Sequence, residues 1–433
     1  AAVGLLLLLS ASGCGFSFSP TDLYSLPQLP EEYTELNSSL NQLLESGAEY
    51  AAPVSGSNIQ PVQLEDLDGD GEEEALAFFR NSADEKPLKI YIFTAGKQGY
   101  EQAAVIEGTG TSIYSIAYED LDQDGRKELL VGWRVNTDLL ALSVYTLRSG
   151  EPEELVQGTS YVKYAVNDLN QDGLWELVVL RADEEGNGIA DYYCWQEEEF
   201  QLRTSARITS TMAELSRGSI VAGRLSDGTP AVFATGVNSQ GMAMTDVLIW
   251  QENGGLTNVV QDRFTGLTSA VYPYMQLAPQ DIDGDGCIEI PAPEQPAKAD
   301  TANTAAAKGL VKWISYDKDG DSASLTVTYH DLAAGWYFRL PDGWGGGITY
   351  TTADNGAYEN QVVLLCSGQP VVALYTLTGD NREKRAMMGG RIALRRQNGV
   401  TYAGELLDGA ASCRLDEETL RQCFNLIVAR WGA

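Results

Sequence analysis

Four short segments of the chain place oxygen-bearing side chains at one spacing, D-x-[D/N]-x-D-G-x-x-E. Oxygens at positions 1, 3 and 5 and a carboxylate at position 9 can wrap a hard cation of the size of Ca²⁺, and the glycine at position 6 permits the sharp turn. The segments therefore predict about four structural calcium ions. The expected ligands are Asp66, Asp68, Asp70 and Glu74; Asp120, Asp122, Asp124 and Glu128; Asp168, Asn170, Asp172 and Glu176; and Asp281, Asp283, Asp285 and Glu289.

The residues around these segments distinguish a hairpin loop from an EF-hand. An EF-hand requires a bidentate glutamate at position 12 and a helix on each side. Position 12 holds Ala77, Val131, Val179 or Ala292, and none of these side chains can bind a cation. The flanking residues are β-branched and aromatic without helical periodicity, as in PVQLE before the first loop and ALAFF after it. Each loop is therefore expected to join two strands of a β-hairpin.

The spacing of the loops predicts a fifth, degenerate copy. The first ligands are 54, 48 and 113 residues apart, and the last interval is about twice the others. Midway through it lies AGRLSDGTPAVFA, with Gly223, Leu225, Asp227, Gly228 and Ala231 at positions 1, 3, 5, 6 and 9. This copy keeps the turn glycine and one carboxylate, so it is expected to form the turn without a cation.

Each repeat also contains two further predicted strands. The third strands are expected at 88–93, 140–147, 190–195, 245–250 and 312–316, and the fourth at 101–106, 153–158, 200–205, 256–261 and 324–329. Four strands in a period of about 50 residues are typical of a propeller blade, which buries both faces only by stacking on its neighbours. The expected fold is mainly β, a β-propeller of about five four-stranded blades at 55–330, with six or seven blades as the alternative. The Ala/Thr/Pro-rich segment 292–309 is expected to be a surface insertion.

These loops and strands resemble FG-GAP/VCBS repeats, the calcium-loop blades of integrin-α-like propellers, here in a bacterial lipoprotein. The resemblance implies structural cations that brace the turn between the first two strands of each blade, held by the ligands named above. The chain departs from the family in the degenerate copy. It also has Glu at position 9, where Asp is more usual, which implies looser coordination or a bridging water.

The first residues, AAVGLLLLLSASGCG, indicate a lipoprotein signal peptide at 1–14. Cys14 follows Ala11, Ser12 and Gly13 and resembles the lipobox cysteine that becomes lipidated; an ordinary signal peptide or a buried strand is the alternative. Residues 15–54 are expected to hold a linker and a short amphipathic helix that packs on the propeller rather than on a partner. Its apolar face comprises Tyr33, Leu36, Leu40, Leu43 and Leu44.

Residues 331–433 form the expected C-terminal α+β domain. They hold 10 Lys+Arg and 11 Asp+Glu, whereas residues 1–330 hold 19 and 50, so the charge changes near residue 330. Six predicted strands precede a helix with Asp416 as its N-cap. The apolar face of this helix is expected to comprise Leu420, Cys423, Phe424, Ile427 and Trp431. The LPDGW start and the closing helix resemble the PsbP/Mog1-type α/β sandwich.

Composition restricts the chemistry of the chain. Its 29 Lys+Arg and 61 Asp+Glu give a formal charge of −32, which excludes electrostatic binding to nucleic acid or to anionic lipid headgroups. GxSxG, GxxxxGK[ST] and HExxH do not occur, and the single histidine, His330, is expected to be structural or exposed. Of the five cysteines other than Cys14, Cys413 and Cys423 are a candidate pair, with free thiols as the alternative.

The expected function is that of a non-enzymatic, calcium-binding propeller of the bacterial envelope, outside the cytoplasm and anchored to the membrane only through the lipid on Cys14. Its expected ligand is an extracellular protein or polysaccharide. A propeller hydrolase or other carbohydrate-active enzyme with a carboxylate pair is the first alternative, because the separation of such a pair depends on the fold. The second alternative is an envelope assembly factor, suggested by the resemblance of the C-terminal region.

Overall fold

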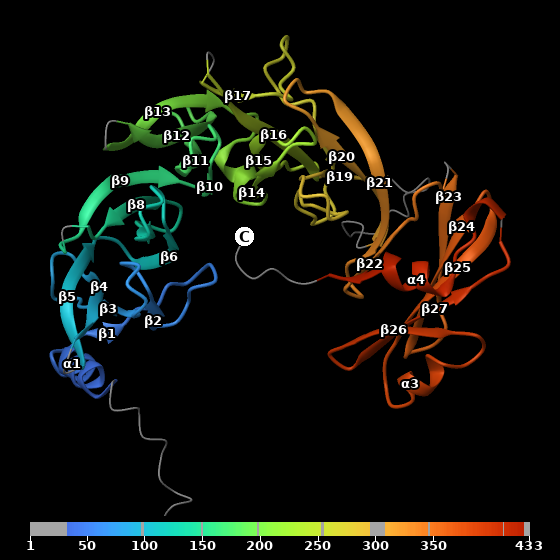
Figure 1. Cartoon of the computed structure of the whole chain (residues 1–433), viewed down its shortest axis with the longest axis horizontal. Helices are drawn as coiled ribbons and strands as arrows, with labels where there is room; N and C mark the ends of the chain where they lie inside the picture. Colours follow the sequence, from blue (N-terminus) through green and yellow to red (C-terminus); the bar gives the residue numbers. More distant parts are fainter. Residues whose placement is uncertain are drawn as a thin grey trace, which may run out of the picture.

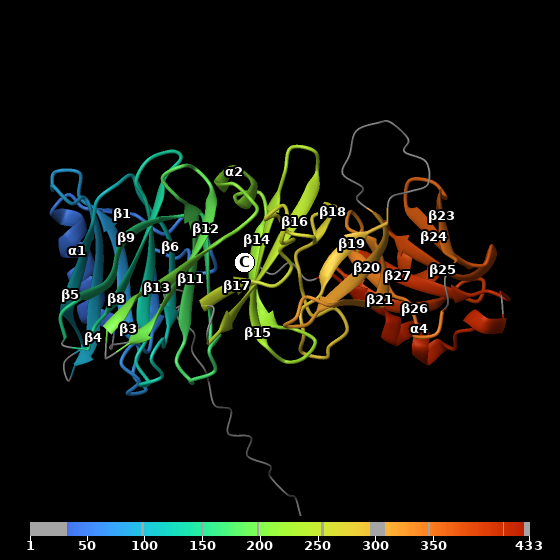
Figure 2. The ribbon, with the colours of Figure 1, turned by 90° about the horizontal axis from the view of Figure 1, so that it is seen from above.

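The computed structural model describes residues 33–96, 99–148, 150–196, 199–252, 255–294, 308–344, 347–409 and 411–427. The signal peptide with Cys14, Trp431 and most of the insertion at 292–309 lie outside these residues. The described residues are mainly β and form six antiparallel sheets. Figure 1 shows the sheets following one another along an arc in chain order, and Figure 2 shows the same succession from above.

The first two sheets each contain a complete predicted repeat. The first sheet comprises β1 (Glu49–Tyr50), β2 (Val62–Glu65), β3 (Glu74–Arg80), β4 (Leu88–Gly96) and β5 (Gly99–Gly108). The second comprises β6 (Ser112–Glu119), β7 (Glu128–Arg134), β8 (Leu140–Thr146) and β9 (Glu153–Tyr161). In both, an acidic loop joins the first strand of the repeat to the second, as expected for a hairpin.

The third and fourth sheets continue the period, so the strands of the degenerate repeat are confirmed. The third comprises β10 (Lys163–Asn167), β11 (Glu176–Ala182), β12 (Gly188–Gln196) and β13 (Glu199–Arg207). After α2 (Met212–Leu215), the fourth comprises β14 (Ser219–Arg224), β15 (Pro230–Val237), β16 (Met242–Gln251), β17 (Gly255–Asn258) and β18 (Val271–Pro273). The degenerate copy joins β14 to β15.

The fifth sheet differs from its expected form at both edges. It comprises β19 (Ile290–Pro293), β20 (Lys308–Tyr316), β21 (Ser322–Asp331), β22 (Trp336–Arg339) and β28 (Phe424–Leu426). Before the loop, only an isolated bridge between Gln280 and Glu289 replaces a first strand. The expected boundary after residue 330 falls inside this sheet, because β22 pairs with β21 and β28 returns from the end of the chain to pair with β22.

The sixth sheet contains the remaining C-terminal strands. Its order is β23 (Ile348–Asp354), β24 (Glu359–Cys366), β25 (Gln369–Leu377), β27 (Val400–Leu406) and β26 (Ile392–Gln397), with α3 (Arg382–Arg385) between β25 and β26. A 3-10 turn (Ala411–Cys413) leads to α4 (Glu417–Cys423). The Asp416 carboxylate accepts the Thr419 N–H at 2.8 Å, so the N-cap is confirmed. The helix was expected to continue, but Phe424 begins a strand that completes the fifth sheet.

Burial on both faces explains the continuous apolar run in the middle of the second strand in the first two repeats. The first six residues of β3 and of β7 are all buried. A strand covered on both sides shows a continuous apolar run instead of alternation. One core cluster joins Phe78 and Ile90 of the first sheet to Ile113 and Trp133 of the second. Further clusters join each following pair of sheets, so the hydrophobic core lies between consecutive sheets.

A helix packs on the first sheet, and the four-residue α3, which has no buried residue of its own, lies beside the sixth sheet. The expected N-terminal amphipathic helix is α1 (Thr34–Glu45), whose Leu36 and Leu40 pack with Phe93 and Tyr100 of the first sheet. At the other end, Ala386 after α3 joins a cluster on the sixth sheet. A stack of repeats exposes an apolar face at each end unless a cap covers it. Figure 1 shows α1 and α3 at opposite ends of the arc.

A disulfide joins Cys366 of β24 to Cys413, with their Cα atoms 6.4 Å apart. Cys413 therefore does not pair with Cys423, which is a buried free thiol in the same core cluster. Cys194 and Cys287 are also free. In the described part of the chain, no helix is both long and apolar enough to cross a membrane.

Candidate metal centres

The four acidic loops occupy equivalent places at the ends of four hairpins. In each, the residue before position 1 pairs across the hairpin with the glutamate at position 9, as Glu65 pairs with Glu74. The same pair recurs in the other loops as Glu119 with Glu128, Asn167 with Glu176, and Gln280 with Glu289. Because the backbone pairing fixes both ends of the loop, the side chains at positions 1 to 9 start from the same geometry in every copy.

The glutamate at position 9 is buried and forms a hydrogen bond across each loop. All four of these glutamates are buried. One carboxylate oxygen, Oε2, accepts the backbone N–H of position 2 in every copy. The donors are Leu67 (2.9 Å), Leu121 (3.0 Å), Leu169 (2.7 Å) and Ile282 (3.1 Å). The second oxygen of Glu128, Oε1, is buried and has no hydrogen-bond partner.

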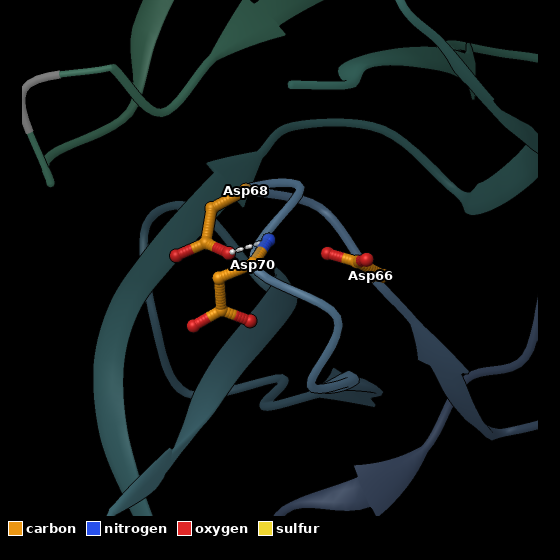
Figure 3. Close-up of side chains that lie close together, drawn as sticks. All are labelled: Asp66, Asp68 and Asp70. Carbon is orange, nitrogen blue, oxygen red and sulfur yellow. Dashed lines mark hydrogen bonds between the residues drawn. The ribbon is translucent and has the colours of Figure 1, made fainter. Parts of the chain in front are cut away.

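The aspartates at positions 1 and 5 hold the turn. In the first loop, Asp66 Oδ2 accepts the Gly71 N–H at 3.1 Å, and Asp70 Oδ1 accepts the Glu72 N–H at 2.8 Å. The other three loops repeat both bonds. Gly71 has φ of +89°, in the region that favours glycine, which explains the glycine at position 6. In Figure 3 the Asp68 and Asp70 side chains lie beside each other, with Asp66 on the other side of the loop and the Asp70 N–H bonded to Asp68.

The loops bring carboxylate oxygens within 4.8 Å of one another in each copy. The groups are Asp66, Asp68 and Asp70; Asp120, Asp122 and Glu128; Asp168, Asp172 and Glu176; and Asp281, Asp283 and Asp285. Glu74, Asp124 and Glu289 belong to the same loops but fall outside these groups. Asn170 contributes an amide oxygen beside the third group, because its side chain contacts Asp172.

Several buried oxygens of these loops have no hydrogen-bond partner, and this indicates whether the loops can bind a cation. Four such atoms in the described residues belong to predicted ligands: Asp122 Oδ1, Glu128 Oε1, Asp168 Oδ1 and Asp283 Oδ1. Leaving a buried carboxylate oxygen unpaired is unfavourable. A hard cation that takes oxygen ligands would satisfy these atoms, so the donor set fits an ion such as Ca²⁺.

The pKa values of the glutamates at position 9 also indicate that these loops fit a cation. Burial, with a smaller contribution from aspartates of the same loop, raises the pKa of Glu128, Glu176 and Glu289 to about 7. Burial also raises the pKa of Glu74. The protein groups around these glutamates therefore do not compensate their negative charge. A divalent cation would favour the ionised form of each carboxylate.

Backbone hydrogen bonds connect successive loops. The carbonyl of position 2 accepts the N–H of position 8 in the next repeat: Lys127 donates to Leu67, Trp175 to Leu121, and Ile288 to Arg224, each at 2.8 Å. The first two loops also touch, because a Cβ on Gly69 would lie 2.2 Å from the Gly125 carbonyl oxygen. The sequence does not predict the bonds between positions 2 and 8, since these positions carry side chains of unrelated types.

The degenerate repeat interrupts this chain of contacts. Its position 8 is Pro230, which has no N–H to donate. Instead, the Asn167 side-chain amide of the preceding repeat donates to the carbonyls of Gly223 (3.2 Å) and Ala231 (3.3 Å). The connection between the third and fourth sheets at this corner therefore uses a side chain in place of the main-chain bond between positions 2 and 8 that the other three junctions share.

His330 is structural, one of the two expected outcomes. Its side chain is buried between aromatic rings, with the Tyr337 ring stacked on it at 5.0 Å. Burial lowers its pKa to about 4. A neutral imidazole enclosed in this way has no access to a substrate.

The fold and the loops define a β-repeat protein with an acidic hairpin loop at one corner of each repeat. Residues 66–131 match the family model of the FG-GAP-like repeat, so the chain carries this repeat, as the resemblance implied. The matched segment runs from the first acidic loop through the second.

Solved structures give a weaker similarity. The crystal structure of AofleA from Arthrobotrys oligospora matches at 9% identity and a TM-score of 0.27, covering 76% of this chain and 90% of that chain. A mutant of AofleA with three arginines replaced by alanine matches at 10% identity and a TM-score of 0.28, with the same coverage. A search of curated proteins finds no match.

Proposed function

We propose that the protein is a non-enzymatic binding protein of the β-propeller type, braced by about four structural Ca²⁺ ions. The observation that carries this proposal is the shared geometry of the four acidic loops, together with the buried carboxylate oxygens that remain without a partner in the second, third and fourth of them. The FG-GAP-like repeat at 66–131 supports a propeller of binding or adhesion type. The closed ring and the count of five blades are part of this proposal.

The loop chemistry favours Ca²⁺ over other cations. Every side-chain donor is a carboxylate or amide oxygen, which excludes the nitrogen and sulfur ligands preferred by zinc and copper. Ca²⁺ accepts six to eight oxygens in flexible geometry, whereas Mg²⁺ requires a near-ideal octahedron and retains water. The sixteen side chains predicted from the sequence are the proposed ligands, supplemented by the carbonyl of position 7.

Two buried carboxylates outside the loops make contacts that stabilise the fold. Asp191 pairs with Arg181 and accepts the Ser205 hydroxyl. Asp246 accepts hydrogen bonds from Thr209 and Asn258. These carboxylates are satisfied by protein groups, as expected for structural residues. This favours binding over catalysis as the role of the sheets.

We also propose a location outside the cytoplasm, with a lipid on Cys14 as the membrane anchor and an extracellular protein or polysaccharide as the ligand. The Cys366–Cys413 disulfide supports an oxidising compartment. Metabolic labelling with a fatty acid tests the anchor, since the label should be lost in Cys14→Ala and retained in Cys194→Ala. Labelling that persists in Cys14→Ala would refute the anchor and leave the calcium proposal intact.

Calcium removal tests the central proposal. Calcium bound only by the folded state stabilises it by about 2.7 kcal/mol per site at a hundredfold excess over Kd. We expect the chain to contain about four calcium ions by elemental analysis and its Tm to fall after chelation. Readdition of Ca²⁺ should restore the Tm, and Mg²⁺ at the same concentration should restore less. Absence of bound metal together with an unchanged Tm contradicts the proposal.

A further inference from the structure

The five repeats carry different residues at one equivalent position at the end of the third strand. In every repeat, position 10 pairs with a third-strand residue: Ala75 with Phe93, Leu129 with Tyr145, Leu177 with Tyr193, Val232 with Leu248, and Ile290 with Ile314. Three residues further along stand Gly96, Arg148, Gln196, Gln251 and Asp317, in the same order. Only the second repeat has a basic residue at this place.

Arg148 reaches the carboxylates of its own loop. Its Nη2 pairs with Asp122 Oδ2, and its Nε lies 3.4 Å from Asp124 Oδ2. The guanidinium also stacks on Trp195 of the third sheet, with its central carbon 4.9 Å from the ring centroid. Three contacts therefore hold one positive charge between the second loop and the next repeat.

This contact coincides with a difference in the loop itself. In the first and last loops the oxygens at positions 1, 3 and 5 converge, whereas in the second loop Asp124 at position 5 is not part of the converging group. Arg148 neutralises charge on two of the four carboxylates that a cation would use. Ligand charge is one of the quantities that set calcium affinity in such loops.

We propose that Arg148 is the internal counter-ion of the second loop, and that it lowers the affinity of this loop for Ca²⁺ while stabilising the cation-free loop. This inference rests on the proposed calcium-binding function. A divalent cation and the guanidinium repel each other and draw on the same carboxylates. The second loop is therefore the last to fill as Ca²⁺ rises. Its filling changes the surroundings of Trp195.

Two substitutions of the full chain test the role of this charge. Arg148→Gln introduces the residue type that the third repeat carries at this place. Arg203→Gln is the matched control, because Arg203 is exposed, contacts Gln196 at the equivalent place in the third repeat, and has no contact with a loop carboxylate among those described. Both variants lose one positive charge, so effects of net charge alone appear equally in both.

Calcium titration by calorimetry gives the first readout, and Trp195 fluorescence, taken as the difference from Trp195→Phe, gives the second. We expect Arg148→Gln to move the weakest calcium phase and the Trp195 signal to Ca²⁺ concentrations lower by about tenfold. The Tm of the chelated protein should fall in this variant. Arg203→Gln should leave both quantities unchanged.

The outcomes separate the two proposals. Calcium uptake with an unchanged or weakened phase in Arg148→Gln overturns the role of Arg148 and leaves the calcium-binding function standing. No calcium uptake by the unsubstituted chain overturns both. If Arg148→Gln does not fold after chelation, Arg148→Lys decides: it retains the charge but not the planar fork, so the calcium affinity of its weakest phase should rise by clearly less than tenfold. A tenfold gain in affinity in Arg148→Lys contradicts the proposal.

Discussion

The acidic loops and the degenerate loop form the same turn by different means. In the first loop, strand pairing stops at Glu65 and Glu74, which leaves eight residues in the loop. In the degenerate repeat, pairing continues to Arg224 and Pro230, which leaves five. The degenerate turn is closed by the Leu225 N–H bonded to the Thr229 carbonyl, and Asp227 accepts N–H groups from Thr229 and Lys318. Main-chain pairing and a neighbouring hairpin thus replace the converging carboxylates.

The comparison separates what the turn needs from what a cation needs. A glycine at position 6 and paired flanking strands are common to both kinds of loop. The buried glutamate and the converging aspartates are specific to the acidic loops, and they leave oxygens without partners. The acidic loops thus carry more carboxylates than the degenerate loop needs to reverse the chain, which favours a cation-binding role for them.

The largest expected effect is that of Glu176→Ala, which gives the third loop the position-9 residue of the degenerate loop. Glu176 is buried and its Oε2 accepts the N–H groups of Leu169 and Asn170, so its loss leaves buried donors unpaired and removes a proposed ligand. We expect the free energy of unfolding to fall by about 3 kcal/mol in the presence of Ca²⁺. Urea denaturation measures this.

Glu199→Ala is the control, because Glu199 is exposed on the same sheet and should change stability by less than about 0.5 kcal/mol. Equal losses in the two variants would contradict the structural role of position 9.

The next effect is the pH dependence of stability that His330 causes, which does not depend on the acidic loops. Burial lowers the folded-state pKa of His330 to about 4, below the ordinary value of 6.5. As pH falls below 6.5, the unfolded state takes up the proton first, so stability is lost progressively down to about pH 4. We expect His330→Gln to remove about 2 kcal/mol of the stability difference between pH 6.5 and pH 5, measured by urea denaturation with Ca²⁺ present. An unchanged difference would show that His330 is not buried as a neutral ring.

A smaller effect compares position 5 in the two kinds of loop. Asp70 and Asp227 are both exposed, and each accepts the N–H two residues further along. With Ca²⁺ present, Asp70→Ala should destabilise the protein by about 1 to 2 kcal/mol, because it removes a ligand as well as a hydrogen bond, and Asp227→Ala by about 1 kcal/mol or less. After chelation the two losses should become similar. A larger loss for Asp227→Ala with Ca²⁺ present would reverse the assignment of the cation loops.

The smallest effect is expected for Pro230→Ala, which restores an N–H at position 8 of the degenerate repeat. Loss of the proline raises the entropy of the unfolded chain, whereas a new hydrogen bond to the preceding loop stabilises the fold. These contributions are similar in size and opposite in sign, so the Tm should change by less than about 2 °C. A loss of several degrees would show that the proline ring itself is needed at this corner.

The sequence predicts the repeats well because the residues that define each loop and its flanking strands are close together in the chain. The spacing of Asp66, Asp68, Asp70 and Glu74 indicates the loop, and the apolar runs on each side indicate the strands, including those around Asp227. The sequence does not predict that β28 returns to pair with β22, because pairing between residues 336–338 and 424–426 depends on the packed core and leaves no periodic pattern. For the same reason the Cys366–Cys413 pairing and the contact of Arg148 with Asp122 appear only in three dimensions.

The hydrogen bonds between positions 2 and 8 use only main-chain atoms at three of the four junctions between consecutive repeats. Each of these bonds by itself sets no requirement on the side chains at positions 2 and 8, so duplication or deletion of a whole repeat can preserve it. The junction at Pro230 lacks this freedom, because it requires Asn167 in the preceding repeat. Evolution of chain length in this protein is therefore expected to add or remove repeats before the third sheet rather than between the third and the fourth.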